Sequence, residues 1–107
     1  MSLIYKGQNL FLDNISVKSI GKNNATPFYV YSYKKIRSNF ETFSNYFKRV
    51  KPLICFSVKS NSNISLISEL GKLGSGADVV SEGELLKTLK AGIKPNKIVF
   101  SGVGKTE

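Results

Sequence analysis

Short apolar stretches separated by turn residues make up the first 31 residues of the chain. Stretches of strand type lie at Leu3–Lys6, Asn9–Leu12, Ile15–Ile20 and Phe28–Tyr31. Gly7 supplies the backbone freedom that a hairpin turn requires, and Pro27 favours an extended approach to the fourth stretch. The pattern therefore predicts short β-strands in this region, and it gives no indication of chemistry.

The period of the apolar positions changes after Ser32. Apolar residues then follow at intervals of four, three, four and three, at Ile36, Phe40, Phe43, Phe47 and Val50. Such spacing places them along one stripe of a helix, which we predict over Lys34–Arg49 with Ser32 as its cap. An aromatic stripe of this kind could bind a ligand, but burial statistics favour core packing, and we assign it to packing.

From residue 52 onward, strand patterns alternate with helix patterns. The predicted strands are the apolar run that ends near Val58, and the stretches Ala77–Val80 and Lys97–Phe100. One intervening helix begins after Asn63, and the other begins where Ser81 and Glu84 match a capping box. This alternation predicts an α/β fold with parallel strands and right-handed crossovers.

Two α/β architectures begin with this alternation, the open doubly wound sheet and the TIM-type (β/α)8 barrel. Three strands cannot separate the two architectures by pattern. A complete barrel needs about 250 residues. On the barrel interpretation, the 107 residues are therefore the N-terminal portion of a longer protein.

Charge and composition narrow the possible function classes. Sixteen basic and seven acidic residues give a net charge of +9, but nearly all the basic residues are lysines scattered along the chain. Nucleic-acid-binding surfaces usually concentrate their positive charge and often use arginine, so we expect no nucleic-acid partner. The chain has no histidine, which leaves metal centres and Ser-His-Asp catalysis with almost no suitable groups, and we expect no metal site.

The single cysteine and the lack of long apolar runs indicate the compartment. Cys55 has no cysteine partner within the chain, so we expect a buried structural thiol in a reducing environment. Met1–Lys6 lacks the basic-then-apolar layout of a signal peptide, and no apolar run approaches the ~20 residues of a membrane span. We therefore expect a cytoplasmic protein without a membrane partner.

Lys59 is the first candidate for chemistry because it ends an apolar strand. Sheet alternation predicts Ile54, Phe56 and Val58 on one face, and Cys55, Ser57 and Lys59 on the other. The lysine therefore shares its face with small side chains that leave room for a ligand. The alternative is that Lys59 simply carries its ammonium group into water at the end of the strand.

Asp78 is the second candidate, because an isolated carboxylate in an apolar strand is costly to bury without a cation or several donors. Two interpretations stay open for this residue. It is either a structural carboxylate that binds loop backbone or a partner for Lys59 on the adjacent strand. Glu84 raises the same question, but its place in the capping box explains it.

The segment Gly102–Thr106 ends like a phosphate-binding P-loop. That motif needs a glycine five positions before Gly104, and this position is Val99. We therefore expect no nucleoside-triphosphate site, and we assign the glycines to a tight turn after a strand.

Four segments together resemble a known enzyme family. Phe56–Asn63 resembles the Tyr-Ala-Val-Lys-Ala-Asn-Ser-Asn motif of the pyridoxal-phosphate decarboxylases with an alanine-racemase-like barrel. Gly76–Leu85 and Ala91–Thr106 look like the corresponding stretches of the diaminopimelate decarboxylase branch, and Thr26–Tyr31 resembles the family's approach to the barrel. The resemblance covers nearly all of the chain in family order.

The resemblance implies a fold, a cofactor and an activity. Residues 32–107 would be the first helix and first three strands of a (β/α)8 barrel, and residues 1–31 would pack with a C-terminal β domain. Lys59 would hold pyridoxal 5′-phosphate as a Schiff base, with Asp78 lining the same pocket. The full-length protein would be a homodimeric carboxy-lyase that binds an amino-acid substrate, converting meso-2,6-diaminopimelate to L-lysine and carbon dioxide in lysine biosynthesis.

The same resemblance also implies which parts of the active site these 107 residues would contain. Burial of Lys59 would favour the neutral form of its amine. The neutral amine is the form needed for exchange with the amine of a substrate. The groups that bind the cofactor's phosphate and ring nitrogen would lie beyond Glu107, so we expect the 107 residues alone to be inactive.

Departures from the family motif keep the substrate open. Ser57 and Ser60 stand where the motif has alanine, although neither change removes a reactive group. Ornithine, arginine and carboxynorspermidine decarboxylases share the lysine motif and are alternatives. Outside the family, the alternative is a non-catalytic basic α/β module that binds an anionic partner.

Overall fold

The structure of the chain, a computed structural model, describes residues 3–106. Residues 1, 2 and 107 lie outside the described part, and with them the first two residues of the predicted β segment and the last residue of the predicted barrel segment. The chain forms two compact units, the first up to Asn39 and the second from Phe40 onward.

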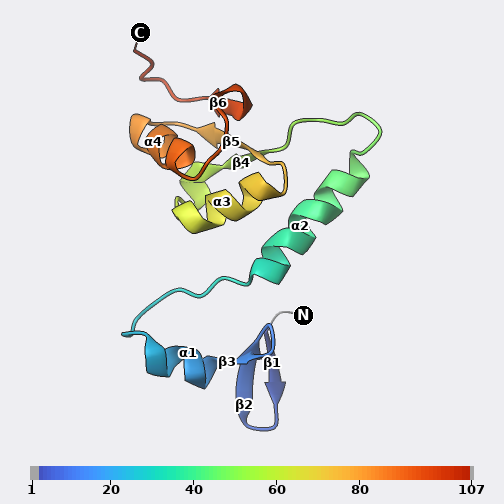
Figure 1. The fold of residues 1–107 in the computed structure, drawn as a ribbon, viewed down its shortest axis with the longest axis vertical. Coiled ribbons are helices and arrows are strands. Elements are labelled where there is room, and N and C mark those ends of the chain that lie inside the picture. Colours follow the sequence, from blue (N-terminus) through green and yellow to red (C-terminus); the bar gives the residue numbers. More distant parts are fainter. Residues whose placement is uncertain (1–2, 107) are drawn as a thin grey trace. The chain divides into compact units, whose positions relative to one another are not determined.

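The first unit is built on a three-stranded antiparallel sheet. Its elements are β1 (Leu3–Lys6), β2 (Asn9–Leu12), β3 (Ile15–Ser16) and helix α1 (Val17–Asn23), with the strands in the order β1-β2-β3 (Figure 1). Lys6 pairs with Asn9, which leaves Gly7 and Gln8 as a two-residue turn, and Gly7 has a φ of +60°. This left-handed backbone favours glycine, and the predicted hairpin is confirmed.

One predicted strand of the first unit is shorter than expected, and another is absent. Ile15–Ile20 pairs with β2 over its first two residues and then coils into α1. Ser16 occupies the N-cap position of that helix, where the chain leaves the sheet, although its side chain makes no capping hydrogen bond. Phe28–Tyr31 has no regular structure, because no strand among residues 3–106 pairs with it.

Helix α2 (Tyr33–Tyr46) confirms the predicted helix, although it ends at Tyr46 rather than at Arg49. The Ser32 hydroxyl caps it by accepting a hydrogen bond from the Lys35 backbone N–H, with an N···O distance of 3.0 Å. None of the residues of α2 is buried, and Phe43 is 52% exposed. Ile36 and Phe40 of the apolar stripe are half-buried, but no member of the stripe is fully buried, so its assignment to core packing is not confirmed by residues 3–106.

The second unit contains a three-stranded parallel sheet with strands in the order β4-β5-β6 (Figure 1). Its elements are β4 (Cys55–Ser57), the 3-10 turn η1 (Val58–Ser60), α3 (Ile64–Lys72), β5 (Gly76–Val79), α4 (Glu82–Lys90), the 3-10 turn η2 (Pro95–Lys97) and β6 (Ile98–Phe100). The predicted strand-helix alternation is confirmed. The last strand begins one residue later than predicted because Lys97 belongs to the preceding turn.

The buried side chains of the second unit lie between the sheet and helices α3 and α4. They are Val58, Ile67, Leu70, Ala77, Val79, Ala91 and Ile93, together with the polar residues Ser75 and Thr88. On β5, Ala77 and Val79 are fully buried, whereas Asp78 between them is only half-buried. Because strand residues alternate between faces, the sheet has one face packed on the helices and one more open face that carries Asp78.

Both helices of the second unit begin at capped residues. The Asn63 side chain accepts hydrogen bonds from two backbone N–H groups of the first turn of α3, at 2.9 and 3.3 Å. Ser81 Oγ accepts one from the Glu84 backbone N–H at 3.2 Å, which confirms half of the predicted capping box. The Glu84 carboxylate binds the backbone N–H of Val80 at 2.9 Å rather than that of Ser81, so the return bond falls one residue earlier than predicted.

Candidate functional site

Lys59 lies at the centre of the single turn η1, which directly follows β4. The predicted strand alternation stops at Ser57, because the next residue, Val58, turns into the core and is fully buried. Lys59 itself is exposed, which agrees with the alternative that it carries its ammonium group into water and not with the burial that the resemblance would imply. The buried neighbour fixes the backbone beneath Lys59, while the lysine side chain extends into solvent.

Asp78 lies on the open face of β5 and pairs in register with Ser57 of β4. Each of its carboxylate oxygens accepts a hydrogen bond from a hydroxyl: Ser101 Oγ lies 2.6 Å from Oδ1, and Ser57 Oγ lies 3.4 Å from Oδ2. Among residues 3–106, no ion pair joins Asp78 to Lys59. The carboxylate is therefore held by serine side chains from both sides rather than by loop backbone.

Cys55 lies two residues before Ser57 on β4, and it is half-buried rather than buried as predicted. Burial raises the pKa of its thiol above the ordinary value, and the negative charge of Asp78 raises it further. A raised pKa keeps the thiol protonated and makes it a poor nucleophile.

The loops that follow β5 and β6 approach each other closely. The Ser101 backbone N–H donates a hydrogen bond to the Val79 carbonyl at 3.0 Å, and a Cβ atom on Gly102 would collide with the Val80 carbonyl oxygen. Only glycine fits this approach without a shift of the backbone. The carboxyl ends of the three parallel strands thus share one edge with the turn of Lys59, and this is the edge where ligands bind in α/β proteins.

Two residues of this arrangement, Ser57 and Ser101, have no role predicted from the sequence. The sequence pattern places Ser57 only as a small neighbour of Lys59. The parallel pairing of the strands could have indicated both residues. It places Ser57, the last residue of β4, opposite Asp78, and Ser101 directly follows β6. Hydroxyls in these positions are within reach of a carboxylate on the strand between them.

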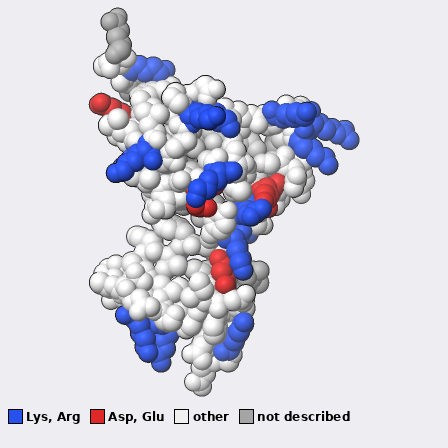
Figure 2. All heavy atoms as spheres, viewed as in Figure 1, with Lys and Arg blue, Asp and Glu red and all other residues white. Residues whose placement is uncertain are grey.

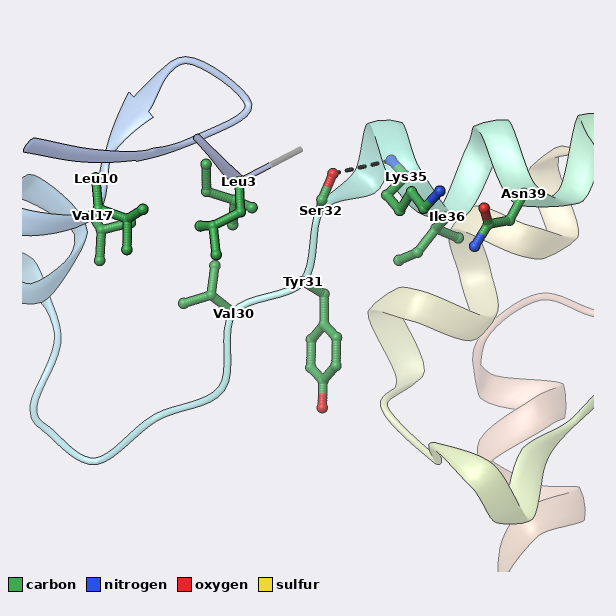
Figure 3. Close-up of a pocket in the computed structure, with 10 residues that line it drawn as sticks. Leu3, Leu10, Val17, Val30, Tyr31, Ser32, Lys35, Ile36 and Asn39 are labelled. Atoms are coloured by element: carbon green, nitrogen blue, oxygen red, sulfur yellow. Dashed lines mark hydrogen bonds between the residues drawn. The ribbon is translucent and has the colours of Figure 1, made fainter. Parts of the chain in front are cut away.

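A separate hollow of about 450 Å³ lies in the first unit. Leu3, Leu10, Val17 and Val30 lie around it, near the start of α2 (Figure 3). Its lining is largely apolar, and the polar groups that reach it include no carboxylate or thiol. A surface of this kind suits the packing of apolar side chains better than it suits catalysis.

Other kinds of site find little support in residues 3–106. On the face shown in Figure 2, the lysine and arginine side chains form separate groups rather than one continuous stripe. Within the described residues, no three side chains of histidine, cysteine, aspartate or glutamate come together as metal ligands. In the same part of the chain, no helix combines the length and the apolar character needed to cross a membrane.

Residues 33–107 match the sequence profile of a known domain, described as pyridoxal-dependent decarboxylase, pyridoxal binding domain. The match covers most of the chain and includes Lys59 and Asp78. This chain belongs to the pyridoxal-dependent decarboxylases. The family resemblance of the sequence motifs is therefore confirmed.

Several relatives among the pyridoxal-dependent decarboxylases carry one name. The diaminopimelate decarboxylase of Helicobacter pylori (strain J99) is 58% identical over 81 residues, which are 76% of this chain and 20% of that protein. The diaminopimelate decarboxylase of Aquifex aeolicus is 47% identical over 105 residues, 98% of this chain and 24% of that protein.

A solved structure of a protein with the same name is also similar to this chain. The crystal structure of the diaminopimelate decarboxylase of M. jannaschii in complex with L-lysine matches with a TM-score of 0.90 and 32% identity, over 98% of this chain and 26% of that one. This chain spans a fifth to about a quarter of the length of these decarboxylases.

The residues at the sheet edge fit pyridoxal phosphate, the cofactor of the pyridoxal-dependent decarboxylases. The exposed amine of Lys59 can reach an aldehyde carbon, and its backbone is anchored by Val58. Asp78 supplies a carboxylate in a fixed orientation on the open face of the sheet. An amine nucleophile and an oriented carboxylate are groups that such a cofactor requires of its protein.

Proposed function

We propose that this chain is the N-terminal part of a diaminopimelate decarboxylase, which converts meso-2,6-diaminopimelate to L-lysine and carbon dioxide. The observation that carries the proposal is the exposed Lys59 on a core-anchored turn after β4, within the matched residues 33–107. The names of the relatives at 47% and 58% identity support this substrate over ornithine or arginine. Formation of lysine also agrees with the lysine complex of the M. jannaschii relative.

In this proposal, Lys59 binds pyridoxal 5′-phosphate covalently through its side-chain amine. The cofactor supplies an electron sink that stabilises the charge left when carbon dioxide departs. The turn η1 orients the lysine, and its exposed position lets a substrate amine approach the same point. Asp78 lies along the cofactor pocket and fixes a negative charge on the open face of the sheet.

We further propose that residues 32–107 form the first helix and first three strands of a (β/α)8 barrel. The parallel order β4-β5-β6 and the single helix-covered face of the sheet support this architecture, since the open face would then point into the barrel. Residues 1–31 would contribute to a β domain completed by later sequence. Its apolar hollow, lined by Leu3, Leu10 and Val30, supports such packing.

The remaining parts of the proposal concern the whole protein. It would be a cytoplasmic homodimer, and the groups that bind the cofactor phosphate and ring nitrogen would lie beyond residue 107. The relatives are about four times as long as this chain, which leaves ample sequence for those groups.

Reductive trapping tests the position of the cofactor. The full-length protein is incubated with pyridoxal phosphate, reduced with borohydride and digested, and the modified peptide is identified by mass spectrometry. We expect the label on Lys59 and its loss in the Lys59→Arg variant. Label on another lysine of the wild-type protein would overturn the assignment.

The substrate is tested by release of carbon dioxide. The full-length protein is assayed with meso-diaminopimelate, ornithine and arginine at equal concentrations. We expect release from diaminopimelate together with formation of lysine. Faster release from ornithine or arginine would assign the protein to another branch of the family.

A further inference from the structure

A chain of side-chain hydrogen bonds crosses all three strands of the parallel sheet and ends at the turn of Lys59. Ser101, after β6, donates to Asp78 on β5 at 2.6 Å, and Ser57 on β4 donates to the other oxygen of the same carboxylate at 3.4 Å. The carbonyl oxygen of Ser57 in turn accepts a hydrogen bond from Ser60 Oγ at 2.7 Å. Ser57 thus contacts Asp78 through its side chain and the turn through its backbone.

Besides the packing of the buried Val58 in the core, hydrogen bonds hold the turn. Its one backbone hydrogen bond runs from the Asn61 N–H to the Val58 carbonyl at 3.1 Å. A 3-10 turn of three residues has poorer hydrogen-bond geometry than an α-helix, so it holds its shape weakly without additional contacts. The Ser60 hydroxyl closes the turn by its hydrogen bond to the Ser57 carbonyl, and Val58 anchors the turn in the core. Lys59 lies between Val58 and Ser60 in the sequence.

We propose that Ser57 and Ser60 are positioning residues for Lys59. Ser57 couples the turn to Asp78, and Ser60 couples it back to β4, so the backbone of Lys59 is held in register with the carboxylate. The inference rests on the proposed function, because it concerns the geometry of the cofactor-bearing lysine. It goes beyond that function, because both hydroxyls stand where the family motif has alanine.

The physical basis is the length of the lysine side chain. Four rotatable bonds separate its amine from the backbone, and a small rotation of the turn moves the amine over a large distance. A turn held at both ends reduces this range before any cofactor arrives, which lowers the entropy cost of forming a bond at one defined point.

The test uses the full-length protein and the variants Ser57→Ala and Ser60→Ala. Ser62→Ala is the matched control, because the Ser62 hydroxyl also takes part in a hydrogen bond, which it accepts from Lys87 Nζ at 3.0 Å, but has no link to Asp78. The readout is the rate at which the cofactor-free protein binds pyridoxal phosphate, followed by visible absorbance and by borohydride trapping at Lys59. Melting temperatures of the variants identify any general loss of structure.

We expect the two positioning variants to load the cofactor about 3- to 10-fold more slowly, as the loss of one ordinary hydrogen bond allows. Ser62→Ala should load like the wild type, and Ser57→Thr, which keeps the hydroxyl, should restore most of the rate. In an Asp78→Ala background, Ser57→Ala should add no further effect, because its partner is already absent. A purely structural role would not produce this dependence on Asp78.

The outcomes separate the two proposals. If the wild type is labelled at Lys59 and both positioning variants load as fast as Ser62→Ala, the positioning role is wrong and the proposed function stands. An effect of Ser57→Ala that is equally large with and without Asp78 would also overturn the coupling. If the wild type is labelled at another lysine, the proposed function fails first.

Discussion

Asp78 is unusual at the scale of single residues because both of its oxygens accept hydrogen bonds from serine hydroxyls on either side. A carboxylate held in this way keeps its orientation without a cation beside it. Its charge also acts on a third side chain, since it raises the pKa of the Cys55 thiol in addition to the effect of burial. Asp78 therefore interacts with three side chains: it accepts hydrogen bonds from Ser57 and Ser101, and its charge acts on Cys55.

The Asp78→Asn variant of the cofactor-free full-length protein should lower the pKa of the Cys55 thiol. Removal of the negative charge makes the thiolate easier to form, while burial continues to hold the pKa above its ordinary value. Alkylation of Cys55 by iodoacetamide, measured by mass spectrometry across a pH series, should therefore become faster at every pH below the wild-type pKa.

The matched control is Asp13→Asn, which makes the same charge change in the first unit, where the Asp13 carboxylate accepts a hydrogen bond from Ser32 Oγ. This variant should leave the alkylation profile of Cys55 unchanged. Equal profiles for Asp78→Asn and the wild type would show that the carboxylate does not act on the thiol.

The sequence identified Lys59 and Asp78 because each stands out locally, as a charge in an apolar run. Ser57 and Ser101 do not stand out, since serines are common and their roles here depend on which strands are neighbours. The sequence left the exposure of Lys59 open, because strand alternation predicts its side chain on one face of the sheet although β4 ends at Ser57. Val58 left the strand to enter the core, and this event depends on the helices packed against it.

At the scale of elements, the second unit followed its local signals closely. Helix caps, glycines and apolar runs lie next to one another in sequence there, and each agrees with the fold. The first unit was less predictable, because Ile15–Ile20 has strand-type residues but little sheet to join. The prediction of a strand at Phe28–Tyr31 is wrong for the same reason, since strand formation depends on a partner strand and not on residue type alone.

The cap of α3 gives a prediction at this scale. Asn63→Ala removes the acceptor for two backbone N–H groups and should lower the free energy of unfolding by about 1 kcal/mol. Asn63→Asp keeps the acceptor and adds a favourable charge at the helix N-terminus, so it should show no such loss. Urea unfolding of the two variants checks the difference, and equal losses would mean that the cap contributes nothing.

At the scale of the whole molecule, buried side chains are distributed unevenly. Every fully enclosed apolar residue in the described part belongs to the second unit, whereas the first unit exposes large side chains such as Tyr5, 74% exposed, and Tyr29, 89% exposed. No local pattern could have shown this, because the positions have ordinary apolar periodicity. The surfaces that would cover them are not supplied by residues 3–106.

Hydrogen exchange of the isolated 107-residue chain should reflect this difference. Backbone amides of β5, which pair on both sides and lie over the core, should exchange slowest, and those of β1–β3 should exchange much faster. Mass spectrometry of peptides from the exchanged chain gives the comparison. Similar protection in both sheets would show that the first unit is stabilised by contacts other than its own core.

Val58, which is buried in the core, and Lys59, the candidate cofactor-binding residue, are adjacent in the sequence. The turn cannot reorient without lifting Val58 out of its packing against the helices. With pyridoxal phosphate on Lys59, the colour of the protein would therefore last on heating for as long as this core remains closed. Loss of this colour on heating would then indicate that the hydrophobic core of the second unit has unfolded.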